Sequence, residues 1–130
     1  MNCSCFRSRE SNCYYVFRAS LKDENEFQTL YISGAVDIES RIDLIDALQL
    51  ALASESSSLI INLSGVSSVS SSGVGAILNA MQEFEKKGKH LILAEPSPIC
   101  KHVLELLRLE DLFIILKDQD SAVTWVKEHP

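Results

Sequence analysis

The pattern of hydrophobic and polar positions begins with two runs of residues that favour β-strands. The runs Tyr14–Ala19 and Phe27–Ser33 are separated by the polar segment 21–26, which predicts a hairpin with a polar turn. Gly34 is expected to end the second strand, and Asp37 to cap a helix that ends at the serine-rich segment 54–58. The apolar face of that helix consists of Leu44, Ile45, Leu48, Ala51 and Leu52.

The rest of the chain alternates apolar strands with amphipathic helices. Strands are predicted at Leu59–Leu63, His90–Ala94 and Leu112–Leu116, and the first of these is apolar enough to be covered on both faces. A serine-rich loop after Leu63 leads into a second helix, and Ser97 and Pro98 suit the cap and first position of a third. The inward positions expected are Val74, Ile77, Leu78, Met81 and Phe84 in the second helix, Ile99, Val103, Leu106 and Leu107 in the third, and Ala122, Val123 and Val126 in a last helix over Asp118–Glu128.

The order of these elements predicts an α/β fold. Two strands are followed by three helix–strand pairs and a final helix, and such alternation is typical of a sheet with right-handed parallel crossovers. Four helices are too few to cover both faces of the sheet, so one face is expected to be partly open.

Composition and charge narrow the class of protein. A chain of 130 residues with 46% hydrophobic and 23% charged residues fits one globular domain. Its net charge of -6 and pI near 5.0 exclude a basic nucleic-acid surface. No apolar stretch has the length of a membrane span, and the first twelve residues lack the apolar centre of a secretory signal. We therefore expect a cytoplasmic protein without membrane insertion.

The cysteines do not indicate a metal or redox site. Cys3, Cys5 and Cys13 crowd into the N-terminus, Cys100 stands alone, and the histidines are scattered. We expect residues 1–13 to be a flexible segment with reduced thiols, residues 14–130 to form the domain, and Cys100 to be a small apolar helix residue.

The serine-rich segment before the second helix is the candidate functional site. Free backbone N–H groups and the helix dipole favour negative charge at a helix start, so a phosphate on Ser71 or Ser72 would be locally stabilised. The glycines there are not followed by Lys-Ser/Thr, and the segment has no Gly-x-Ser-x-Gly sequence. It is therefore neither a P-loop nor a hydrolase elbow. We predict no enzyme activity, catalytic residue, cofactor or metal.

Several segments, taken in order, resemble the STAS domain of anti-sigma-factor antagonists. They are Gly34-Ala-Val-Asp37, the strand Leu59–Leu63, the loop ending in Ser70-Ser71-Ser72-Gly73-Val74-Gly75, the Lys-Lys-Gly before a strand, and Leu104–Leu109 before Leu112-Phe113. The resemblance covers most of the chain after Tyr14. It implies a four- to five-stranded mixed sheet with about four helices packed mainly on one face.

The resemblance also implies a function. In the family, a partner anti-sigma factor that is itself a serine kinase phosphorylates the serine that matches Ser71, and a serine phosphatase is the expected counterpart. The unphosphorylated form would bind the anti-sigma factor and free the sigma factor. The partner-binding residues implied are Asp37, Ser70, Ser71, Ser72, Gly73 and Val74. Val66 and Val69 are further candidates for contact area, with core packing the alternative for these valines.

Three positions depart from the family pattern. Ser70 replaces the motif aspartate, Asn62 replaces an acidic residue of the preceding strand, and Arg108 replaces a glycine that often ends the third helix. Ser70 can still cap the second helix but supplies no carboxylate. The alternative function is therefore a scaffold or ligand-sensing STAS module that binds a nucleotide, lipid or transporter partner without phosphorylation.

Overall fold

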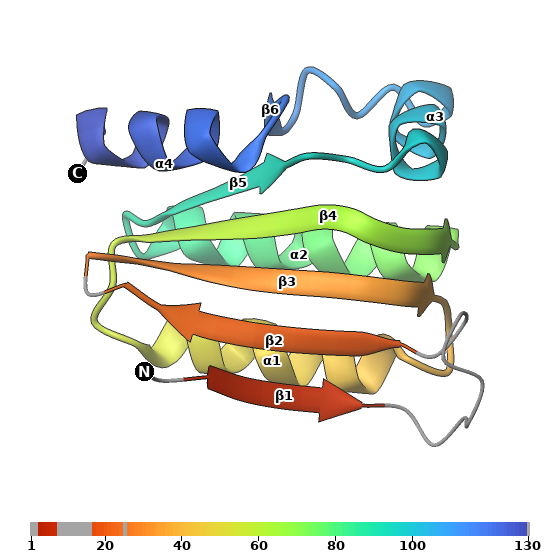
Figure 1. Ribbon diagram of the computed structural model, residues 1–130, viewed down its shortest axis with the longest axis horizontal. Helices are drawn as coiled ribbons and strands as arrows, with labels where there is room; N and C mark the ends of the chain where they lie inside the picture. The colour runs from red at the N-terminus through yellow and green to blue at the C-terminus, as the bar shows by residue number, and fades with distance from the viewer. Residues whose placement is uncertain (1–2, 8–16, 25, 130) are drawn as a thin grey trace.

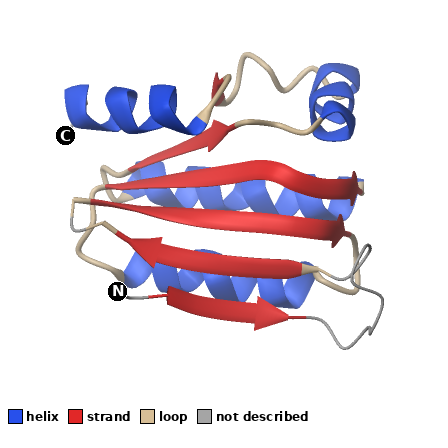
Figure 2. Ribbon diagram, in the orientation of Figure 1, coloured by secondary structure: helices blue, strands red, loops and turns tan. Residues whose placement is uncertain are grey.

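A computed structural model describes residues 3–7, 17–24 and 26–129, and in this part of the chain six strands form one sheet with four helices (Figures 1 and 2). The elements follow in the order β1 (Cys3–Arg7), β2 (Arg18–Asp23), β3 (Phe27–Val36), α1 (Arg41–Ala53), β4 (Ser58–Val69), α2 (Ser71–Lys86), β5 (His90–Ala94), α3 (Pro98–Leu106), β6 (Ile114–Leu116) and α4 (Gln119–Glu128).

The strands lie side by side in chain order. β1, β2 and β3 pair antiparallel, whereas β3, β4, β5 and β6 pair parallel, each pair connected by one of the helices α1 to α3. This confirms the mixed α/β sheet with helical crossovers. The sheet has one strand more than predicted, because β1 lies in the segment 1–13, where the sequence predicts no strand.

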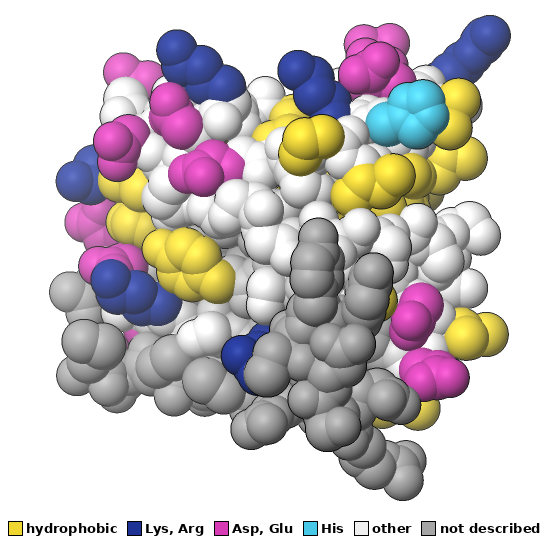
Figure 3. Space-filling view, turned by 45° about the vertical axis from the view of Figure 1, so that its right-hand side comes forward, with side chains coloured by type: hydrophobic (Ala, Val, Ile, Leu, Met, Phe, Trp, Pro, Cys, Tyr) yellow, Lys and Arg dark blue, Asp and Glu magenta, His cyan; other side chains and the backbone are white. Residues whose placement is uncertain are grey.

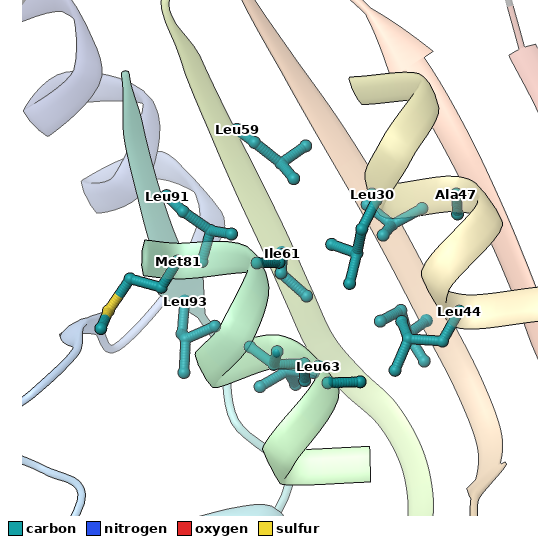
Figure 4. Close-up of a cluster of buried hydrophobic side chains, with 14 of the residues drawn as sticks. Leu30, Leu44, Ala47, Leu59, Ile61, Leu63, Met81, Leu91 and Leu93 are labelled. Carbon is teal, nitrogen blue, oxygen red and sulfur yellow. The ribbon is translucent and has the colours of Figure 1, made fainter. Parts of the chain in front are cut away.

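The helices are packed mainly on one face of the sheet, as predicted. On β4, Leu59, Ile61 and Leu63 point toward α1 and α2, and their neighbours in this main core include Leu30, Leu44, Ala47, Met81, Leu91 and Leu93 (Figure 4). Ile60 points to the opposite face, where α4 covers it through Ala122 and Val126. The strand therefore needs apolar side chains on both faces, which explains its apolar run, interrupted by Asn62. Over β2 the described residues place no helix on the α4 face (Figure 1).

Several boundaries differ from the predicted ones, and the last strand, β6, begins at Ile114 rather than at Leu112. β2 extends to Asp23, so the hairpin turn is shorter than the polar segment 21–26. β3 does not end at Gly34, which adopts a φ of 84° at a register shift and lets the strand continue to Val36. The serine-rich loop is largely absent, since β4 continues to Val69 by pairing with β3. Ladder hydrogen bonds with β3 outweigh the turn preference of serine there.

The inward face of α3 was also predicted wrongly. Cys100 and Leu104 are the buried residues of this helix, whereas Ile99, Leu106 and Leu107 are exposed and Val103 is only partly buried. Apolar residues occupy two adjoining stripes of the helix, and the sequence alone does not say which stripe meets the core. Burial raises the pKa of the Cys100 thiol, consistent with its expected part as a small apolar helix residue.

Arg108 occupies the position where the family often has a glycine, and the effect of this replacement on stability can be tested. It follows α3 with a φ of 56°, and the N–H of Leu109 donates to the carbonyl of Leu104 at 2.9 Å, so the helix ends through a left-handed residue. Because a Cβ destabilises this conformation by about 1 kcal/mol, we expect Arg108→Gly to stabilise the protein by up to that amount. Urea denaturation followed by the fluorescence of Trp125 measures the change. A loss of stability in Arg108→Gly would contradict the expectation.

Candidate functional site

The predicted site lies where β3 and β4 end and α2 begins. Only Ser70 separates β4 from α2, and its backbone N–H donates to the carbonyl of Val36 at 2.8 Å. As the N-cap of α2, Ser70 accepts a hydrogen bond at its Oγ from the N–H of Gly73 (3.4 Å), and its carbonyl accepts from the N–H of Val74 (3.1 Å). The predicted cap is confirmed, and it ties the start of α2 to the end of β3.

Gly73 allows the helix to lie against β3. A Cβ at this position would overlap Cγ1 of Val36 and come within 3.2 Å of its carbonyl oxygen. Gly73 therefore permits a close approach of the two backbones. Gly75 has no such role, because an added Cβ there would meet nothing within 4 Å.

Ser71 and Ser72 are the hydroxyls in the first turn of α2. Ser71 is exposed and Ser72 half-buried, and neither side chain forms a hydrogen bond to the residues that the structure describes. The first turn contains no acidic residue, and the helix dipole and the free N–H groups of this turn favour a negative charge placed there. This environment favours an anion, such as a phosphate on Ser71.

Asp37 does not cap α1 as predicted. The N-cap is Ser40, and Oδ1 of Asp37 instead accepts hydrogen bonds from the N–H groups of Glu39 and Ser40, both at 3.0 Å. Ser40 is buried, with 1% exposure. It was not among the predicted site residues. The spacing Asp-x-x-Ser, in which each side chain can reach the backbone of the other residue, was the sequence signal for it.

The valines near the site belong mainly to the core. Val74 is 7% exposed and Val66 is also buried, while Val69 packs partly buried against the same core. The alternative of core packing is therefore the right one for Val66 and Val74. Val74, predicted as a partner-binding residue, has too little exposed side chain to provide a surface contact.

Asn62 lies on the sheet face that α4 covers and is buried in a polar network. Its Nδ2 donates to Oε1 of Gln119 at 2.9 Å, and its Oδ1 accepts from the N–H and hydroxyl of Ser64. Gln119 in turn donates to Oγ1 of Thr29 at 3.1 Å. These bonds use both ends of the amide, so Asn62 anchors α4 to the sheet and offers no free group to a partner.

Exposed apolar side chains gather on α3 and on the loop after it. Four of them are Ile99, Leu106, Leu107 and Leu112. Figure 3 shows such side chains around a histidine at the upper right of this face, next to a broad area without charged side chains. A cluster of this kind is typical of a protein-binding surface. We call these four residues the α3 patch.

The hollows near Ser71 are small. A groove between α1 and α2, lined in part by Arg41, Gly75 and Glu83, has a volume of about 130 Å³. The cavity beneath the site, between α2 and α3, has a volume of about 20 Å³, and all of its lining residues are apolar or cysteine. That is room for roughly one water molecule. Within the described ranges no three His, Cys, Asp or Glu side chains are grouped to hold a metal. No described helix is both long and apolar enough to cross a bilayer.

Comparisons with known proteins agree with this arrangement. The family model described as STAS domain matches residues 19–122. A solved anti-sigma factor antagonist from Mycobacterium paratuberculosis has a TM-score of 0.77 and 22% identity, covering 85% of this chain and 94% of that chain. SpoIIAA in its unphosphorylated form has a TM-score of 0.74 and 22% identity, covering 86% and 98%. The Bacillus cell fate determinant SpoIIAA in its phosphorylated form has a TM-score of 0.65 and 23% identity, covering 83% and 98%. A sequence search of curated proteins finds no match.

Proposed function

Because this chain belongs to the STAS domain family, we propose that it is an anti-sigma factor antagonist that binds its partner when Ser71 is unmodified and loses it when Ser71 is phosphorylated. The partner is an anti-sigma factor with serine kinase activity, and a serine phosphatase resets the switch. Binding takes place in the cytoplasm and releases a sigma factor. The protein acts by binding and is not itself an enzyme.

The observation that carries the proposal is the exposed, unpaired hydroxyl of Ser71 in the first turn of α2. A kinase can reach it without unfolding the domain. A phosphate adds about -1.5 to -2 charge, which the helix start tolerates. The added charge therefore changes what the surface can bind and leaves the fold intact.

Ser70 does not remove this capacity. Serine and aspartate are comparable N-caps, and the Oγ of Ser70 is seen in that position. With no carboxylate in the first turn, the charge that phosphorylation adds is the first negative charge there, so the contrast between the two states is large.

The α3 patch lies at the same end of the molecule as the start of α2 (Figure 1), where it can supply contact area for a protein. We assign the α3 patch to the same interface, because apolar anchors dominate the binding energy of most protein complexes. The apolar cavity beneath Ser71 has a volume of about 20 Å³, and the groove between α1 and α2 beside Gly75 has a volume of about 130 Å³. Both are smaller than the roughly 300–1,000 Å³ of typical ligand pockets, which favours a protein partner over the alternative of a ligand-sensing module.

The test is a pull-down from the host lysate, followed by calorimetry with the recovered protein. We expect wild type and Ser71→Ala to recover an anti-sigma factor kinase and Ser71→Glu to bind it at least about 30-fold more weakly, since like charge in an interface costs several kcal/mol. The kinase with ATP should phosphorylate wild type but not Ser71→Ala.

Thr124→Glu is the matched control for Ser71→Glu. Thr124 is exposed on α4, so this variant gains the same charge away from the start of α2 and should keep the affinity of the wild type. If Ser71→Glu and wild type bind the same unrelated protein equally well, the switch is wrong and the scaffold alternative takes its place.

A further inference from the structure

The end of β3 is held by a reciprocal pair of side chains in the turn before α1. Oδ1 of Asp37 accepts from the N–H groups of Glu39 and Ser40, and Oγ of Ser40 accepts from the N–H of Asp37 at 2.9 Å. The hydroxyl of Ser40 donates to the carbonyl of Ala35 at 3.0 Å. Because Ser40 is buried, the bonds that it forms are partly shielded from water, and together the bonds leave the backbone from Ala35 to Ser40 little freedom.

The same stretch of backbone supports the start of α2. Val36, the last residue of β3 before the turn, accepts the hydrogen bond from the N–H of Ser70 at 2.8 Å, and its side chain fills the space beside Gly73. Ser71 lies between these two contacts. A shift of the carbonyl of Val36 would therefore move the residues on both sides of Ser71.

We infer that Asp37 and Ser40 are positioning residues for Ser71. They hold Val36 in place, Val36 holds Ser70 and Gly73, and the hydroxyl of Ser71 is thereby presented in one orientation to kinase and partner. Asp37 does this as a hydrogen-bond acceptor through Oδ1, and its negative charge is not required. The claim that the orientation of Ser71 affects partner binding rests on the proposed function.

Substituting asparagine for Asp37 distinguishes the role of the hydrogen-bond acceptor from the role of the charge. In Asp37→Asn the Oδ1 acceptor remains and the charge is lost, whereas Asp37→Ala loses both. Ser40→Ala removes the reciprocal hydroxyl. Oδ2 of Asp37 accepts no hydrogen bond from the described residues, so placing an amide NH₂ there breaks no internal contact that the structure shows.

The experiment measures backbone amide hydrogen exchange at Ser70 by NMR, together with affinity for the anti-sigma factor kinase. We expect Asp37→Asn to match wild type in both measurements. Asp37→Ala and Ser40→Ala should exchange the Ser70 N–H about tenfold faster and bind the kinase about tenfold more weakly, as loss of a turn or cap hydrogen bond commonly does.

Val126→Ala controls for a general loss of stability. Val126 is a buried residue of α4 in the core on the other face of the sheet, so this variant should unfold more easily without changing exchange at Ser70. If Asp37→Asn binds as weakly as Asp37→Ala with normal Ser70 exchange, the charge contacts the partner and the inference is overturned. Unchanged Ser70 exchange in Asp37→Ala overturns it as well. If wild type binds no anti-sigma factor, the proposed function fails, and the exchange rates alone decide the positioning.

Discussion

Gly73→Ala is expected to destabilise the protein and weaken partner binding together. The new methyl group would overlap the side chain of Val36 and approach its carbonyl oxygen, and both are held by the core and the turn before α1. Overpacking of this kind costs about 1–3 kcal/mol, which exceeds the roughly 1 kcal/mol that alanine gains over glycine inside a helix. Relief requires α2 to move away from β3 at its first turn, which displaces Ser71.

Gly75→Ala is the matched control on the same helix. Gly75 is exposed, and an added Cβ meets no atom within 4 Å, so only the gain in helix propensity remains. We expect it to stabilise the protein by about 0.5–1 kcal/mol. Urea denaturation of both variants, followed by Trp125 fluorescence, measures the two changes. If both substitutions change the free energy of unfolding equally and in the same direction, close contact between α2 and β3 at Gly73 is not what determines the effect of the added methyl group.

Leu106→Lys is expected to weaken binding of the anti-sigma factor kinase by at least about 30-fold with little change in stability. Leu106 is 67% exposed at the end of α3, where a cation is compatible with the helix dipole. Truncating one of the few hot-spot residues of an interface costs about 2 kcal/mol or more, and we assign Leu106 this part, whereas exposed substitutions change stability by about 0.5 kcal/mol or less.

Leu50→Lys provides the comparison for Leu106→Lys. Leu50 is 49% exposed near the end of α1, which lies at the other end of the molecule from the start of α2 (Figure 1). We expect calorimetry to find wild-type affinity for this variant. If both lysine variants bind like wild type, the α3 patch is not part of the interface, and the interface is confined to the surroundings of Ser71.

The proposed phosphorylation switch and the proposed role of the α3 patch can be tested separately. Ser71→Glu tests whether charge at the start of α2 blocks binding, and Leu106→Lys tests whether apolar area on α3 supports it. A protein that fails the first and passes the second would be a STAS scaffold that uses this surface without phosphorylation.

The sequence by itself determined the order of elements from β2 onward, the central place of β4, and the Ser70 cap of α2. These features rest on local signals, namely hydrophobic period, cap residues and the length of apolar runs, which neighbours in the chain supply. The motif around Ser71 was likewise readable, because a cap and a glycine at fixed spacing lie within one helical turn.

Only the tertiary structure decided where β3 and β4 end, which stripe of α3 is buried, and what Asp37 does. β4 passes through a serine-rich stretch because β3 lies beside it and pairs with it. α3 buries Cys100 and Leu104 because the helix packs on β4 with that side, although the apolar stripe beside it is equally hydrophobic. The link between Asp37 and Ser71 is the hydrogen bond between their neighbours Val36 and Ser70, two residues far apart in the chain. Such choices depend on contacts between distant segments, whose energies exceed local propensity and leave no periodic trace in the sequence.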